Sequence, residues 1–137
     1  MITEDYVSFE IAKLLKEKGF DCACEVWYSE YTSQFGGEKY TSIEFDNHNR
    51  FKDTYKFICY APTIQMVMKW LREVHKIHIS VDIGFDVDNH QYYFFIPSVC
   101  RFSDKSGEYE TPFGEKEFNT YEEATEDVIV YCLENLI

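Results

Sequence analysis

Several motifs that mark common enzyme chemistries are missing from this sequence. It has no Cys-x-x-Cys pair and no Gly-x-Ser-x-Gly turn around a nucleophilic serine. It also lacks the glycine-rich loops Gly-x-x-x-x-Gly-Lys-Ser/Thr and Gly-x-Gly-x-x-Gly, so nucleotide binding by those loops is excluded. The sequence therefore predicts no catalytic residue and no cofactor, and it favours a non-enzymatic function over an enzymatic one.

Long apolar runs are missing as well. No stretch approaches the roughly 18 apolar residues of a membrane-spanning helix. Charged residues interrupt the first twenty positions, where a signal peptide would have a continuous apolar segment. We expect a cytoplasmic protein that does not bind membranes.

Basic residues are scarce. Lys and Arg number 13 against 25 Asp and Glu, and residues 104–137 alone carry a net charge of −8 out of −12. A protein that binds nucleic acid by neutralising phosphates needs the opposite sign, so direct nucleic-acid binding is not expected. The acidic third is either a solvated face or a surface that attracts a basic partner.

The cysteines are few, odd in number and scattered. Such spacing favours reduced, buried thiols in a cytosolic protein over a disulfide framework. Those in apolar patterns (Cys59, Cys100, Cys132) are expected to be inert. The five cysteines are Cys22, Cys24, Cys59, Cys100 and Cys132.

Apolar residues are plentiful, at 45% of 137 residues with 12 Phe and 11 Tyr. That is enough for a hydrophobic core without disulfides or metal, and the length suits a single globular domain over residues 1–137.

The hydrophobic periodicity predicts an α+β fold. We expect an antiparallel sheet of four to five strands with about three helices packed on one face, in the order α, β-meander, α, β-hairpin, α. Residues 29–40 and 103–118 are predicted as polar loops. The helices are predicted over residues 5–18, from Pro62 to His75 and from Thr120, and the strands over 20–28, 40–45, 54–60, 77–85 and 91–102.

One cluster of polar side chains follows the strand predicted over residues 77–85. Asp82, Asp86, Asp88 and His90 provide the oxygen and imidazole ligands of a divalent cation, which would suit a metal-dependent hydrolase. The same residue types dominate ordinary turns, and the spacing does not fit an EF-hand. His75-x-x-His78 is a second metal pattern, although the two histidines belong to different predicted elements.

A second set of residues predicts an interaction surface. Tyr92 and Phe94 lie in a run of four aromatic residues, half of which must face away from the core of a strand. Such a strand could form a partner interface or the seam of a homodimer. The acidic side chains of the last predicted helix would lie beside it: Glu122, Glu123, Glu126 and Asp127.

Three stretches carry a family resemblance. Residues 6–20 (YVSFEIAKLLKEKGF), Ala61-Pro62-Thr63 with residues 70–75 (WLREVH), and residues 120–124 (TYEEA) resemble an uncharacterised family of short proteins from gut bacteria and their phages. The resemblance implies a mobile-element context, and the family offers no activity that could be carried over to this chain.

These observations favour a non-enzymatic accessory factor that binds another protein. An acidic mimic of nucleic acid, which would inhibit a DNA-binding protein, is the first alternative. The metal-dependent hydrolase is the second.

Overall fold

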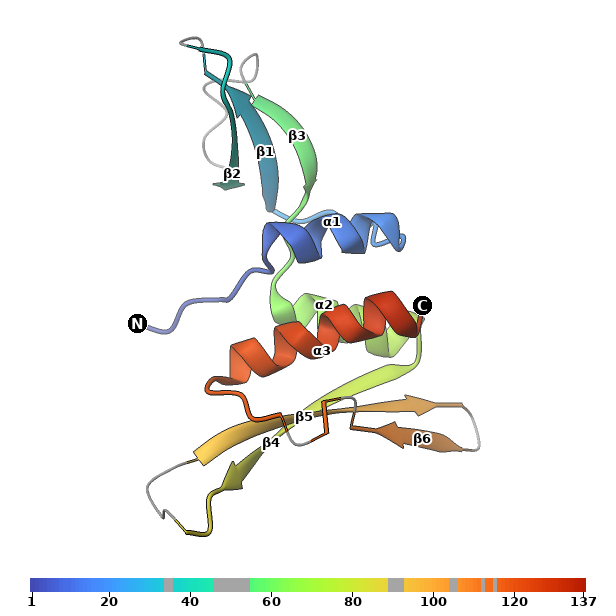
Figure 1. The fold of residues 1–137 in the computed structure, drawn as a ribbon. Helices are drawn as coiled ribbons and strands as arrows, with labels where there is room; N and C mark the ends of the chain where they lie inside the picture. The colour runs from blue at the N-terminus through green and yellow to red at the C-terminus, as the bar shows by residue number, and fades with distance from the viewer. Residues whose placement is uncertain (34–35, 46–54, 89–92, 104–105, 112, 115) are drawn as a thin grey trace. The chain divides into compact units, whose positions relative to one another are not determined.

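The computed structural model describes residues 1–33, 36–45, 55–88, 93–103, 106–111, 113–114 and 116–137. In that part of the chain, three helices and six strands form two compact units, residues 1–63 and 64–137 (Figure 1). The predicted α+β class and the three helices are confirmed. The strands form two three-stranded antiparallel sheets, so the predicted single sheet of four to five strands is wrong. A single domain over residues 1–137 stays a prediction.

The first unit contains helix α1 and a sheet in the order β2-β1-β3. Both neighbours of β1 run antiparallel to it, so β1 is central and the strands do not follow one another as a meander. The nine residues between β2 and β3 are long enough to reach the other edge of β1, which a tight turn would not allow. The bounds are α1 Phe9–Glu17, β1 Val26–Thr32, β2 Lys39–Phe45 and β3 Tyr55–Tyr60.

The end of α1 agrees with the prediction to within one residue, whereas its start lies further along the chain for a local reason. The hydroxyl of Ser8 accepts a hydrogen bond from the Ile11 N–H at 3.3 Å, so Ser8 caps the helix, which begins at Phe9 instead of near Asp5. At the other end Gly19 has a φ of 88°, and the Phe20 N–H donates to the Leu15 carbonyl at 2.9 Å. This glycine cap, followed by the buried Phe20, ends the helix, and β1 begins at Val26 instead of the predicted residue 20.

Side-chain bonds join α1 to its sheet. The Tyr28 hydroxyl donates to the Val7 carbonyl at 2.7 Å, and Lys16 Nζ donates to the Ile58 carbonyl at 2.6 Å. The helix therefore lies against the start of β1 and the end of β3, as Figure 1 shows.

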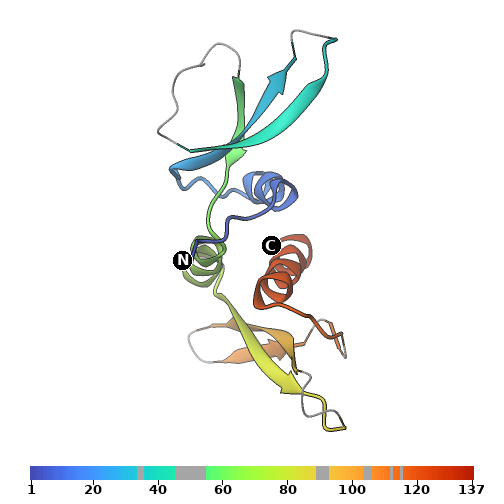
Figure 2. The same cartoon turned by 90° about the vertical axis from the view of Figure 1, so that its left-hand side faces the viewer.

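The second unit contains a sheet in the order β4-β5-β6, with α2 and α3 on the same face (Figures 1 and 2). The predicted hairpin of β4 and β5 is confirmed. Strand β6 lies within residues that were predicted as a loop. The strand was not predicted because its mostly exposed residues show no apolar alternation. The bounds are α2 Ile64–Val74, β4 Ile77–Phe85, β5 Tyr93–Phe102, β6 Gly107–Glu110 and α3 Tyr121–Asn135.

Helix α3 follows the prediction closely. The Thr120 hydroxyl accepts from the Glu123 N–H at 3.1 Å, which caps the first turn. The apolar stripe of this helix is buried at Ala124, Val128, Ile129, Cys132 and Leu133.

Within the described residues, no helix combines the length and the apolar character needed to cross a membrane.

Candidate functional site

Strand β4 changes from buried to exposed along its length. Its odd-numbered residues share one face, yet Ile77 and Ile79 are 1% and 4% exposed while Ile83 and Phe85 are 56% and 67% exposed. The 11-residue α2 is about 16 Å long at 1.5 Å per residue. The nine-residue β4 is about 30 Å long at 3.3 Å per residue. The helix above β4 thus reaches along only half of it, and Figure 2 shows the far end of β4 running away from both helices.

The uncovered end of the hairpin forms an apolar surface, which we call the apolar overhang: Ile83, Phe85, Val87 and Tyr93. Tyr93 lies directly opposite Phe85 on β5. Its ring contacts that of Phe95 edge-on at 6.0 Å, and Phe95 contacts Tyr121 of α3 at 6.4 Å. These ring contacts tie Tyr93, the β5 member of the overhang, to helix α3.

The backbone of β4 has one unpaired edge in the described sheet, where β5 is its only neighbour. The Phe102 N–H donates to the Lys76 carbonyl at 3.0 Å, which makes these two residues a hydrogen-bonded pair. Such pairs alternate along an antiparallel ladder, so the even-numbered residues of β4 bond to β5. The N–H and C=O groups of Ile77, Ile79, Val81, Ile83 and Phe85 therefore point away from β5.

Of the two aromatic residues predicted as an interaction surface, Tyr92 lies outside the described residues. Phe94 is half-buried and lies directly opposite Gly84 on β4. Its ring lies so close to Gly84 that a Cβ atom added there would be 2.4 Å from it. Phe94 also lines a cavity of about 320 Å³ with Lys116 and Glu117. The more exposed aromatic residue is its neighbour Tyr93, on the opposite face of the strand. Strand periodicity alone did not indicate which face the helices would cover.

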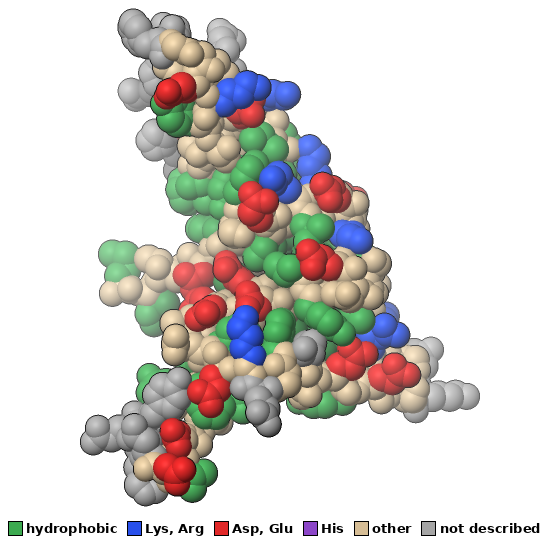
Figure 3. Space-filling view, in the orientation of Figure 1, with side chains coloured by type: hydrophobic (Ala, Val, Ile, Leu, Met, Phe, Trp, Pro, Cys, Tyr) green, Lys and Arg blue, Asp and Glu red, His purple; other side chains and the backbone are tan. Residues whose placement is uncertain are grey.

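The four predicted acidic residues share the outer side of α3, and Figure 3 shows acidic side chains over this helix. Glu122 and Glu123 are exposed, while Glu126 and Asp127 are half-exposed. Asp127 forms an ion pair with Lys116 at 3.0 Å. The acids of β6 lie elsewhere, where Glu110 accepts from the Tyr131 hydroxyl at 2.9 Å. This hydrogen bond raises the pKa of Tyr131.

The predicted cation ligands are only partly within the described chain, since His90 lies outside it. Asp82 is exposed on β4, and Asp86 and Asp88 follow the strand. One carboxylate oxygen of Asp86 accepts from the Asp88 N–H at 3.0 Å, an arrangement typical of a turn. No group of three metal-ligating side chains occurs among residues that the structure describes.

The two histidines of the His75-x-x-His78 pattern have different surroundings. His78 is exposed on β4, whereas the ring of His75 lies edge-on against Trp70 at 4.5 Å. His75 Nε2 is enclosed and has no hydrogen-bond partner, and burial lowers the pKa of this imidazole. Burial therefore disfavours the charged form of this imidazole. On α2, Trp70 is buried and Val74 is exposed.

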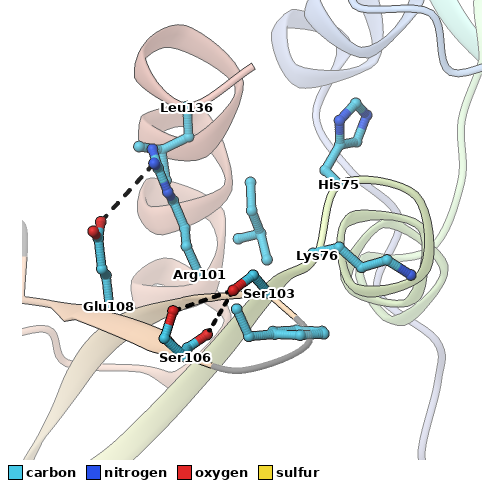
Figure 4. A pocket seen from close by; sticks show the side chains of 9 residues that line it. His75, Lys76, Arg101, Ser103, Ser106, Glu108 and Leu136 are labelled. Carbon is cyan, nitrogen blue, oxygen red and sulfur yellow. Dashed lines mark hydrogen bonds and ion pairs between the residues drawn. The ribbon is translucent and has the colours of Figure 1, made fainter.

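A polar cavity of about 450 Å³, which no sequence pattern predicted, lies at the covered end of β4 (Figure 4). Arg101 Nη2 and Glu108 Oε2 lie 4.0 Å apart, and the hydroxyl oxygens of Ser103 and Ser106 lie 3.1 Å apart. The ends of α2 and α3 also reach this cavity, where exposed carbonyls favour positive charge. The positive charges of Lys76 and Arg101 are therefore offset by the Glu108 carboxylate and by the helix carbonyls. The lining of this cavity favours neither an anion nor a cation.

The cysteines are all free, as predicted, but they are not uniformly buried. Cys59 and Cys132 are buried, and burial raises the pKa of Cys132 to about 12, so that thiol is inert as expected. Cys22 is exposed, because the strand predicted to bury it begins only at Val26.

Comparisons with known proteins give no match: no family model, curated protein or solved structure is similar to this chain.

Proposed function

We propose that this chain is a protein-binding module whose binding surface is the apolar overhang. The observation that carries this proposal is the exposure of Ile83 and Phe85 on a face whose other half is buried. Large apolar side chains gathered at one end of a sheet are typical of interaction sites. Aromatic residues such as Phe85 and Tyr93 are enriched in protein interfaces.

The overhang can be tested by the double substitution Ile83→Asp with Phe85→Asp. Both side chains are exposed, so the fold should survive, as circular dichroism would check. Affinity capture from the native host should recover a stoichiometric protein with the unchanged chain and lose it with the double variant. Phe57→Asp, at an exposed aromatic residue of β3, is the matched control. Equal recovery with all three proteins would contradict the proposal.

The acidic-mimic alternative has less support. Its carboxylates would need to follow one continuous surface, but they divide between α3 and β6, and Lys116 neutralises Asp127. Residues 122–127 rise only about 7.5 Å along the helix axis, which corresponds to roughly two base pairs of duplex.

The hydrolase alternative stays a prediction that rests on Asp82, Asp86, Asp88 and His90. Calcium and manganese titrations test it directly, and no binding at millimolar metal would end it.

A cytoplasmic location and a mobile-element origin also belong to this proposal. They rest on the sequence patterns and on the family resemblance, and genes for phage functions beside the coding sequence would support them.

A further inference from the structure

We infer that the partner of the apolar overhang is a second copy of this chain, joined to the first along the β4 edge. This inference rests on the proposed function and names its partner. Two copies related by a twofold axis would pair their β4 strands antiparallel, and the two three-stranded sheets would become one sheet of six strands.

The backbone restricts the possible registers. The outward N–H and C=O groups belong to odd-numbered residues, so each odd residue must face another odd residue. This parity also keeps the apolar faces of both copies on the same side of the sheet. A twofold axis at Asp82 meets these conditions but places Asp82 opposite Asp82, and directly opposed like charges are destabilising.

A twofold axis at Val81 satisfies every requirement. It pairs the whole of β4, with Ile77 opposite Phe85 and Ile79 opposite Ile83. The uncovered end of each strand then lies beside the covered end of the other. In one copy, β4 extends beyond α2 and leaves the overhang exposed. In the dimer, the helix-covered end of the other copy would lie beside this exposed end.

Charge and surface at the strand ends fit the same register. Lys76, directly before β4, lies opposite Asp86, directly after it, and symmetry forms this pair of opposite charges twice. Val74, the last residue of α2, is 59% exposed and lies three residues before Ile77. Ile77 would face Phe85 of the second copy, so an exposed apolar residue of α2 lies close in the chain to that pair.

Disulfide trapping tests the register. The background variant carries Cys22→Ser, Cys24→Ser and Cys100→Ser, which removes the thiols that are not buried. With Val81→Cys the two Cα atoms would lie about 5.5 Å apart, within disulfide range, so oxidation should yield a covalent dimer. With Ile83→Cys, the matched control, they are offset by about 13 Å along the strands and should not cross-link. Cross-linking of Ile83→Cys alone, or of neither variant, would overturn this register.

Charge reversal supplies a second test. Lys76→Asp and Asp86→Lys should each weaken the dimer by about tenfold, and the two together should restore it. Light scattering should give twice the 16.3 kDa mass for the unchanged chain. A mass of 16.3 kDa at about 100 μM would overturn the inference, because the Kd of any dimer would then lie well above that concentration. Loss of captured host proteins on Ile83→Asp with Phe85→Asp would then still support the proposed function, so the two failures are distinguishable.

Discussion

The two halves of β4 differ in surroundings although they share one sequence pattern. Ile77 and Ile79 lie beneath helices, whereas Ile83 and Phe85 continue the same apolar face into solvent. The difference arises because nine residues of strand extend about twice as far as eleven residues of helix. Apolar alternation therefore indicates which residues share a face, while the length of the covering helix determines which of them are buried.

The largest expected effect compares these halves directly. Ile77→Ala should lower the free energy of unfolding by about 2–5 kcal/mol, because it leaves a cavity in a closed core. Ile83→Ala should change it by about 0.5 kcal/mol or less, since that side chain is exposed. Denaturant unfolding at a dilution that keeps the chain monomeric measures both. Similar losses at the two positions would show that the halves are equally covered.

A second prediction concerns the face of β4 opposite the helices. Gly84→Ala should destabilise the chain by about 1–3 kcal/mol, because the added Cβ would meet the Phe94 ring at 2.4 and 2.6 Å. The smaller Phe94→Leu side chain should relieve part of this loss when the two changes are combined. Purely additive losses in denaturant unfolding would count against that ring contact.

A third prediction concerns the N-terminal cap of α3, the helix that packs on β4 and β5. Thr120→Ala removes the hydroxyl that accepts from the Glu123 N–H, and should cost about 1 kcal/mol. Thr120→Ser keeps an acceptor oxygen and should retain most of the stability. If the two substitutions have the same effect on the thermal midpoint, this cap contributes little.

The smallest effect is a pH dependence from His75 at the covered end. Its pKa is lower in the folded chain than in the unfolded chain, so the unfolded state binds more protons as the pH falls. The stability contribution is therefore complete above the ordinary pKa of 6.5 and declines as the pH falls below it. His75→Phe keeps an aromatic ring beside Trp70 and should flatten this decline in denaturant unfolding between about pH 7 and pH 5. An unchanged slope would contradict the role of His75.

The sequence predicted those elements whose signals are local. The Thr120 cap and the stripe through Val128 and Leu133 identify α3, because caps and helical periodicity act within a few residues. Alternation similarly identifies the hairpin of β4 and β5. The position of β1 between β2 and β3, and the existence of β6, depend on pairing across the chain, which no local pattern encodes.

The candidate site was only partly predictable for the same reason. The aromatic run of β5 drew attention to the right strand, but Tyr93 and not Phe94 lies in the overhang. The exposure of Ile83 and Phe85 follows from the reach of α2, a relation between two elements. Residues of the polar cavity, such as Arg101 and Ser106, come together only when β5 and β6 pair.

Amide hydrogen exchange along β4, measured at several protein concentrations, tests the central claim most directly. At low concentration the amides of Asp82 and Gly84, which bond to β5, should be protected while those of Val81 and Ile83 exchange quickly. As the concentration rises, the amides of Val81 and Ile83 should become protected too, since the second copy bonds to them. Fast exchange of Val81 and Ile83 at every concentration would contradict pairing along this edge.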